Sequence, residues 1–293
     1  GGDNLYLSSI LAIHAETGKL KWHYQTTPGD SWDFTAVQQI ILTQLEIKGK
    51  KREVLMQAPK NGFCYVWDAA DGELISATPF TAQNWTTGQF DENGRPELVE
   101  EAVDLALYAV VPGPTGAHNW HPMAFNPDTG LVYIPVNEIP FFYDKTRNVE
   151  DSKSFWNIGY DAAAGWPVEY PAGTLDAVRD LDGGSLLAWD PVKAEPRWAV
   201  PFPLPLNGGV LSTQAGLVFQ GNKFGEFVAY DDDSNWRRVR LITRAELGGL
   251  ATRVLGAGTY GALERAELEA LLLATVNVTD GGDVVVPVVP VVP

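Results

Sequence analysis

The amino-acid sequence predicts an all-β protein built from β-propeller blades. The first observation is a short motif that recurs five times within about 235 residues: a small apolar residue, an acidic or polar residue two positions on, a turn glycine and then a strand, with weaker copies at 188–198 and 229–236. The second is the content of 29 glycines and 20 prolines, which favours short strands and turns over a helix bundle. A plain row of β-hairpins in a sandwich is the alternative, but five copies favour the propeller.

The turn of the motif contains residues that tight hairpins require. Glu16-Thr-Gly18, Ala70-Asp-Gly72 and Asp128-Thr-Gly130 each put glycine where the backbone needs a positive φ. The two intervals between these glycines are 54 and 58 residues, and these lengths fit blades of roughly 40 to 50 residues with loop insertions. The five copies occupy residues 12–22, 66–74, 124–133, 188–198 and 229–236.

Tryptophans end three of the copies, at Trp22, Trp198 and Trp236. An indole at this point is large enough to stack between neighbouring blades and bury on the order of 200 Å². Cys64 lies between two aromatic residues of a strand and is interpreted as a core residue.

The pattern of strands and turns stops at about residue 237. All ten lysines precede this point. The six basic residues of 237–293 are all arginines, and the one aromatic residue of this segment is Tyr260. We therefore divide the chain into propeller blades, 1–236, and an atypical tail, 237–293. We interpret the tail as the product of a shifted reading frame; a helical docking segment, with a helix over 262–274, is the alternative.

Charge and composition exclude several classes of function. The net charge of −16 and the pI near 4.6 argue against nucleic acid or an anionic membrane surface as a partner. A single cysteine excludes an internal disulfide. No apolar run reaches the roughly 20 residues that cross a bilayer, and no signal peptide is recognisable in this chain.

The first candidate site is Trp32-Asp33-Phe34. Flanking aromatic residues are expected to desolvate Asp33 and raise its pKa toward that of a general base. Asp30 competes for this role, and an Asx-turn aspartate is the alternative interpretation of either residue.

The second and third candidates are polar groups in loops. Lys60 stands where a strand ends in an Asn-Gly turn, and a solvated turn lysine is the alternative interpretation. Asn119 and Trp120 lie between His118 and His121, and they offer an amide and an indole N–H to a planar polar ligand. Two histidines three residues apart lack the further ligands typical of zinc, so we do not predict a metal site on them.

Taken together, these clusters resemble the pyrroloquinoline quinone (PQQ)-dependent alcohol dehydrogenases. The resemblance covers roughly residues 1–232 and is carried by long motifs. These are residues 2–9, 16–33, 58–63, 118–122 and 208–221.

The resemblance implies an eight-bladed propeller with PQQ and Ca²⁺ in its central channel, of which this chain would form about half to five-eighths. It implies that Asp33 is the catalytic base and a Ca²⁺ ligand, and that Lys60 hydrogen-bonds the quinone oxygens. It implies that Asn119 and Trp120 contact the cofactor. Trp22 and Trp198 match the family's tryptophan-docking positions.

The implied activity is the oxidation of primary or secondary alcohols, with PQQ as hydride acceptor and Ca²⁺ as Lewis acid. Cytochrome c as electron acceptor and a periplasmic location follow from the same resemblance. The family's other calcium ligands and its vicinal disulfide cannot be placed in this sequence. We therefore expect a fragment that binds PQQ weakly or not at all on its own.

Two other functions fit the repeats. One is a non-catalytic propeller scaffold of the bacterial envelope, and the other is a membrane-anchored, sugar-oxidising quinoprotein. A scaffold has no need of Asp33, Lys60 and Asn119 together, and the stretch Gly2–Tyr6 favours the soluble alcohol dehydrogenases.

Overall fold

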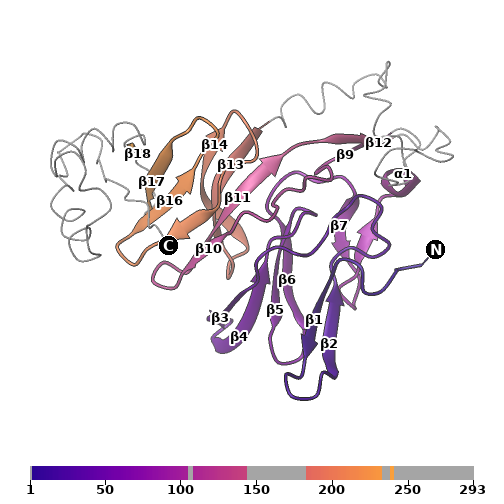
Figure 1. Ribbon diagram of the computed structural model, residues 1–293. Coiled ribbons are helices and arrows are strands. Elements are labelled where there is room, and N and C mark those ends of the chain that lie inside the picture. The colour runs from indigo at the N-terminus through magenta and orange to yellow at the C-terminus, as the bar shows by residue number, and fades with distance from the viewer. Residues whose placement is uncertain (1, 105–107, 144–182, 233–237, 241–293) are drawn as a thin grey trace, which may run out of the picture.

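The computed structural model describes residues 2–104, 108–143, 183–232 and 238–240 (Figure 1). Within them lie strands β1 to β18 and one short helix, α1 (Glu100–Asp104), which confirms the all-β prediction. No helix in these ranges is long and apolar enough to cross a membrane. The expected helix over 262–274 lies outside the described residues, and of the tail 237–293 only β18 (Arg238–Arg240) is described.

Three antiparallel sheets have four strands each, in chain order. Sheet II comprises β3 (Ile41–Ile47), β4 (Lys50–Gln57), β5 (Phe63–Asp68) and β6 (Leu74–Pro79). Sheet III comprises β10 (Ala124–Asn126), β11 (Leu131–Glu138), β13 (Gly183–Asp190) and β14 (Glu195–Phe202). Sheet IV comprises β15 (Val210–Ser212), β16 (Leu217–Gly221), β17 (Phe227–Asp231) and β18.

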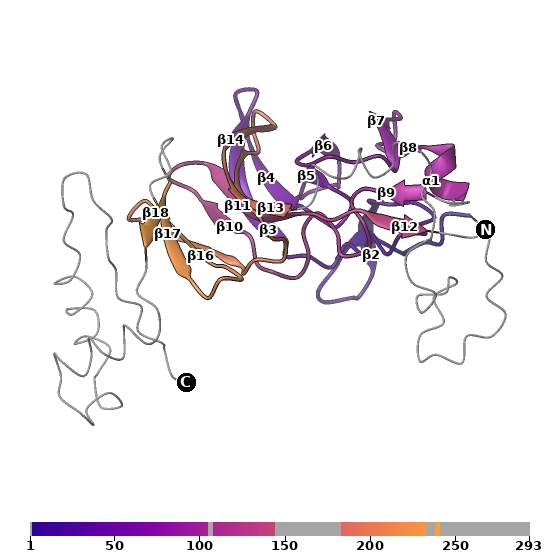
Figure 2. The same ribbon diagram turned by 90° about the horizontal axis from the view of Figure 1, so that it is seen from above.

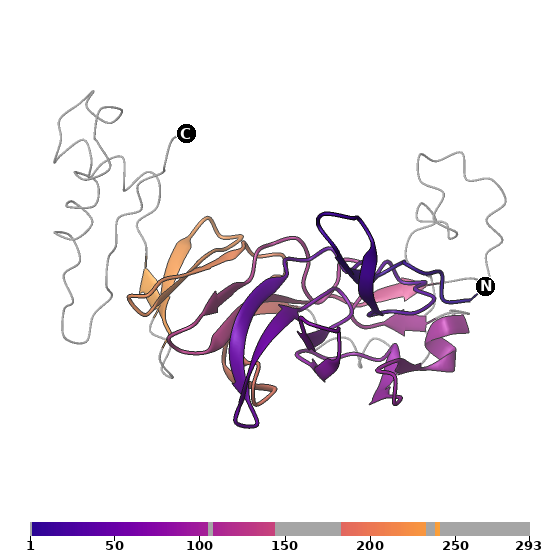
Figure 3. The ribbon, with the colours of Figure 1, turned by 90° about the horizontal axis from the view of Figure 1, so that it is seen from below.

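The remaining strands form two-stranded sheets. Sheet I comprises β1 (Ser9–Ile13) and β2 (Leu20–Gln25). Two more pairs are β7 (Thr86–Phe90) with β8 (Pro96–Leu98), and β9 (Tyr108–Val110) with β12 (Phe141–Tyr143). Figures 2 and 3 show sheets I to IV following one another, with sheet IV on one side of the molecule and sheet I on the other.

The inner sheets are apolar on both faces because each is packed between two others. In β5, Phe63, Tyr65 and Trp67 face sheet I, whereas Cys64 and Val66 face sheet III. A third cluster joins sheets III and IV. This face-to-face packing of successive four-stranded meanders is the arrangement of propeller blades, and it confirms the partial-propeller prediction. Cys64 is buried and free, as expected of a core residue.

Hairpins in three sheets share one register. The pairs Ala12↔Trp22, Val66↔Ser76 and Ala188↔Trp198 are equivalent, and each is followed by the same irregularity in the ladder. The copies at 12–22, 66–74 and 188–198 therefore occupy equivalent places. The copy at 124–133 does not, because its turn joins β10 to β11, the first two strands of sheet III. The interval from Gly72 to Gly130 is thus not a blade repeat.

Both tryptophans of these hairpins contact the next sheet. Trp22 Nε1 donates to the Ala69 carbonyl at 3.2 Å, and a Cβ on Gly72 would lie 2.7 Å from the indole. Trp198 Nε1 contacts the Asp232 carbonyl at 3.5 Å, just after β17. Each indole therefore links the last strand of its hairpin to the turn region of the neighbouring sheet.

Candidate active site

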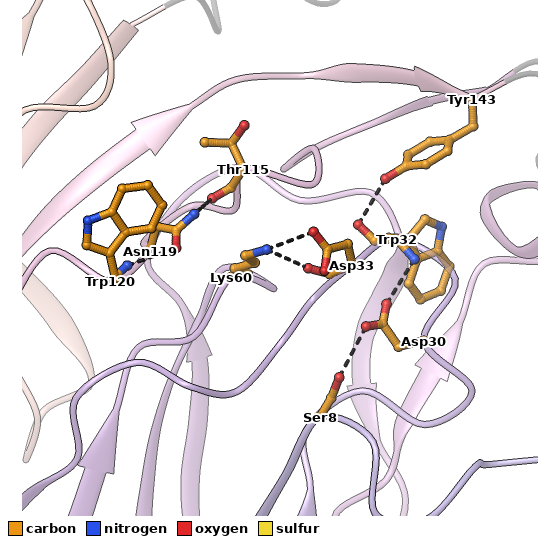
Figure 4. A network of polar contacts seen from close by, with 9 residues as sticks. All are labelled: Ser8, Asp30, Trp32, Asp33, Lys60, Thr115, Asn119, Trp120 and Tyr143. Atoms are coloured by element: carbon orange, nitrogen blue, oxygen red, sulfur yellow. Dashed lines mark hydrogen bonds and ion pairs between the residues drawn. The ribbon is translucent and has the colours of Figure 1, made fainter. Parts of the chain in front are cut away.

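Three connecting segments bring the predicted site residues together (Figure 4). Asp33 lies on the loop between β2 and β3, Lys60 on the turn between β4 and β5, and Asn119 with Trp120 on the connection between β9 and β10. Figure 4 shows Lys60 between Asp33 on one side and Asn119 on the other.

Asp33 and Lys60 form an ion pair. The Lys60 ammonium lies 3.0 Å from Asp33 Oδ2 and donates to the Asp33 backbone carbonyl, also at 3.0 Å. The Lys60 side chain is only 9% exposed, whereas that of Asp33 is 62% exposed. The alternative of a solvated turn lysine is therefore wrong, because Lys60 is buried and carries its charge beside a carboxylate that reaches solvent.

The expected burial of Asp33 is wrong as well. Trp32 and Phe34 are buried in the aromatic cluster between sheets I and II, where both rings pack on Trp85. Because both neighbours turn into the core, Asp33 between them turns outward. Its φ of +66° lies in the left-handed region that L-residues rarely adopt.

Trp32 anchors the loop on which Asp33 stands. Its indole N–H donates to the Ala102 carbonyl at 2.9 Å. Its backbone N–H donates to Asp30 Oδ1 at 2.9 Å, and its carbonyl accepts a hydrogen bond from the Tyr143 hydroxyl at 2.9 Å. Three separate parts of the chain therefore fix the residue that precedes Asp33.

Asp30 has the desolvated environment that the sequence suggested for Asp33. Burial raises the pKa of Asp30, and hydrogen bonds from the Trp32 amide and the Ser8 hydroxyl oppose that rise. Ser8 Oγ donates to Asp30 Oδ2 at 3.1 Å. Both carboxylate oxygens of Asp30 thus accept hydrogen bonds from this chain.

The turn that carries Lys60 is rigidly held. Gly62 takes a φ of +91°, as expected of an Asn-Gly turn. The buried side-chain amide of Asn61 donates to the Thr26 carbonyl at 3.2 Å, and the backbone carbonyl of Asn61 accepts from Trp85 Nε1 at 2.8 Å. The Lys60 ammonium therefore projects from a fixed backbone.

The third segment packs directly on Lys60. A Cβ on Gly116, whose φ is +80°, would lie 2.3 Å from Lys60 Cγ and 2.7 Å from its Cα. Next to it, the Ala117 N–H donates to the Lys60 carbonyl at 2.9 Å. Glycine is required at 116 because no side chain fits between the two segments.

Asn119 and Trp120 are placed near Lys60 but differ in exposure. The Asn119 amide donates to the Thr115 carbonyl at 2.7 Å, and its side-chain oxygen accepts from the Trp120 N–H at 2.9 Å. The Trp120 indole is 72% exposed and stacks on His121. Asn119 shapes its own loop, whereas the Trp120 ring is open to a ligand.

His118 is buried between backbone carbonyls. Its ring nitrogens lie 2.6 Å from the carbonyl oxygens of Ala58 and His121, and burial lowers its pKa. No group of three or more His, Cys, Asp or Glu side chains suited to a metal occurs in the part of the chain that the structure describes.

Comparison with known proteins bears on this geometry. Residues 1–89, which include Asp33 and Lys60, match the family model "Glucose/ethanol/alcohol dehydrogenase, beta-propeller domain". The chain is 52% identical over 235 residues to quinohemoprotein alcohol dehydrogenase ADH IIB of Pseudomonas putida, an alignment covering 80% of this chain and 33% of that protein. The chain is homologous to the PQQ-dependent alcohol dehydrogenases.

Further relatives of this family agree. A 1-butanol dehydrogenase (cytochrome c) of Thauera butanivorans is 40% identical, with 79% of this chain and 33% of that protein covered. The solved structure of quinohemoprotein alcohol dehydrogenase ADHIIG from Pseudomonas putida HK5 superposes with a TM-score of 0.69 at 44% identity, covering 81% of this chain and 36% of that one. The chain thus spans about one third of the length of the alcohol dehydrogenases that it matches.

The sequence alone did not reveal the residues that hold the site. Tyr143 is 111 residues from Trp32 and Ala102 is 70 residues from it, so no local pattern joins them. Gly116 offers one usable signal, because glycine is the residue found where the backbone takes a positive φ or closely approaches another group.

Proposed function

We propose that this chain supplies the carboxylate and the ammonium of the active site of a PQQ-dependent oxidoreductase that acts on primary or secondary alcohols. The observation that supports the proposal is the 3.0 Å pair between Lys60 and Asp33, within the segment that matches the family model. Asp33 is the proposed catalytic base; Lys60, Asn119 and Trp120 are the proposed cofactor-binding residues.

The described residues fit one edge of a quinone. The Lys60 ammonium is a fixed donor for quinone oxygens, and the exposed ring of Trp120 offers a flat apolar surface. When bound, PQQ would supply the electrophilic carbonyl that takes up hydride from the alcohol.

Calcium is a different case. In our proposal Asp33 is a Ca²⁺ ligand, but Ca²⁺ takes six to eight oxygens and the described residues offer no cluster of carboxylates around Asp33. These residues therefore do not fit calcium as a complete site.

The geometry assigns separate tasks to the two oxygens of Asp33. Oδ2 is held by Lys60, and Oδ1 accepts no hydrogen bond from any described residue. Oδ1 would accept the hydroxyl proton of a bound alcohol, because the side chain is exposed and the carboxylate is negative. Lys60 would keep a positive charge next to the quinone oxygen on which negative charge develops as hydride is taken up.

The wider setting follows from the relatives. The Thauera relative is named as a cytochrome c-linked enzyme, so we propose cytochrome c as the electron acceptor of the complete enzyme. We propose the periplasm as its location from the family resemblance alone. We also propose that Trp22 and Trp198 act as tryptophan-docking residues between blades, since each contacts the next sheet.

A chimaera tests the proposal in a whole enzyme. Residues 1–232 of this chain would replace the matched third of the Pseudomonas putida ADH IIB relative, and ethanol-dependent dye reduction would be measured with PQQ and Ca²⁺. We expect activity in the chimaera and a loss of about 10²- to 10⁴-fold in kcat for Asp33→Asn, the range for a general base. Unchanged kcat in Asp33→Asn would contradict the proposal.

Two controls frame this measurement. Asp71→Asn changes an exposed turn carboxylate and is expected to leave kcat unchanged. The 293-residue chain alone is expected to bind PQQ weakly or not at all and to reduce no dye. Sustained turnover by the chain alone would contradict that expectation.

A further inference from the structure

We propose that Asp30 is a positioning residue for Asp33. Its carboxylate holds the backbone of Trp32, directly before Asp33, and so keeps the Asp33 carboxylate on Lys60. The inference rests on the proposed function, because Asp33 is the group to which we assign proton transfer.

The contacts of Asp30 fix the residue that precedes Asp33. Asp30 Oδ1 accepts the Trp32 N–H at 2.9 Å. Trp32 comes directly before Asp33 in the chain. Oδ2 is held in turn by the Ser8 hydroxyl at 3.1 Å, so the carboxylate cannot swing away without losing its own partner.

Asp33 needs such support because of its backbone. Its φ of +66° is a conformation that an L-residue leaves when nothing holds it. Lys60 donates both to the carbonyl and to the carboxylate of Asp33, and both bonds require this one conformation. Partial burial of Asp30 limits the access of water to its hydrogen bond with the Trp32 amide.

The same contacts argue against Asp30 as the proton acceptor. Both of its oxygens already accept hydrogen bonds from this chain, whereas Oδ1 of Asp33 accepts none from the described residues. The Lys60 ammonium pairs with Asp33. Asp30 therefore acts through Asp33.

The inference can be tested without cofactor by the rate at which Lys60 is acetylated. The 293-residue chain would be treated with acetic anhydride, and the modification of Lys60 would be followed by mass spectrometry. Loss of the Asp33 carboxylate removes the ion pair that holds the Lys60 side chain in place, so the reagent reaches its amine more often. We expect about a threefold faster reaction of Lys60 in Asp33→Asn, the size of effect that a partly exposed ion pair allows. Asp30→Ala should match it to within about twofold.

A matched control separates positioning from general loosening. Asp190 Oδ1 accepts the N–H groups of Val192 and Lys193 in the β13–β14 turn, so Asp190→Ala also removes a carboxylate that holds the backbone. In the Asp190→Ala variant, Lys60 should react with acetic anhydride at the wild-type rate. Acceleration of Lys60 in Asp190→Ala equal to that in Asp30→Ala would overturn the inference.

Conservative variants protect the test against misfolding. Asp30→Asn keeps an oxygen for the Trp32 N–H, and Ser8→Ala leaves that bond in place. We expect Lys60 to be acetylated more slowly in both of these variants than in Asp30→Ala. A Lys60 that reacts as fast in Asp30→Asn as in Asp30→Ala would overturn the inference. A chimaera that lacks activity while this order holds would contradict the proposed function alone.

Discussion

The β5–β6 turn and the loop that carries Asp33 use the same local device with different results. In each, an aspartate accepts the N–H two residues further on at 2.9 Å: Asp68 from Ala70, and Asp30 from Trp32. The turn then places its left-handed residue on glycine, Gly72, whereas the loop places it on Asp33. Glycine adopts that conformation without strain because it has no Cβ, whereas Asp33 has a side chain and the strain remains.

The two regions also differ in what holds them. The β5–β6 turn closes on itself through the bond from the Gly72 N–H to the Asp68 carbonyl at 2.9 Å. The Asp33 loop is held by Ala102 and Tyr143, which are far away in the chain. The difference teaches that the blade turns are local structures, whereas the site exists only when several segments are packed together.

Gly116→Ala should produce the largest effect, because it forces apart the two segments that meet at Lys60. A Cβ there would lie too close to the Lys60 backbone, and the alanine would also have to take a left-handed φ. We expect a loss of about 3 kcal/mol in the free energy of unfolding, measured by denaturant titration. A loss no larger than that for Gly18→Ala would contradict the close approach.

Gly72→Ala against Gly18→Ala sharpens the comparison within the blade turns. Both glycines have positive φ, but a Cβ at 72 meets the Trp22 indole at 2.7 Å and one at 18 meets nothing within 4 Å. We expect losses of about 2 and about 1 kcal/mol respectively, from thermal unfolding of the two variants. Equal losses would show that Trp22 does not pack on the turn.

Tyr143→Phe removes one distant support of the Asp33 loop and leaves the ring in place. The buried Trp32 carbonyl loses its 2.9 Å donor. The expected cost is about 1 kcal/mol in the free energy of unfolding, together with faster acetylation of Lys60. A loss of stability with no change at Lys60 would mean that this support does not reach the site.

Ala194→Gly should give the smallest effect and the opposite sign. Ala194 takes a φ of +56° in the β13–β14 turn, at the place that Gly18 and Gly72 occupy in theirs. Glycine there should stabilise the protein by roughly 0.5–1 kcal/mol, seen as a higher midpoint of thermal unfolding. A lower midpoint would show that the Ala194 side chain contributes packing that outweighs the strain.

The scaffold was more predictable than the site for a physical reason. Turn glycines and alternating strands are local signals, and they correctly indicated all-β meanders. The same signals misplaced the copy at Gly130, since a hairpin turn does not reveal which two strands of a sheet it joins. The flanking aromatics predict a desolvated Asp33, but Trp32 and Phe34 are themselves buried in the core, and this turns the residue between them outward.

A double-mutant cycle on Asp33 and Lys60 in the chimaeric enzyme tests the central claim most directly. The values of kcat/KM for alcohol would be compared for Asp33→Asn, Lys60→Met and the double variant. If the two side chains act as one unit, the double variant should lose about as much as the worse single variant. Losses that simply multiply would contradict a joint site on this pair.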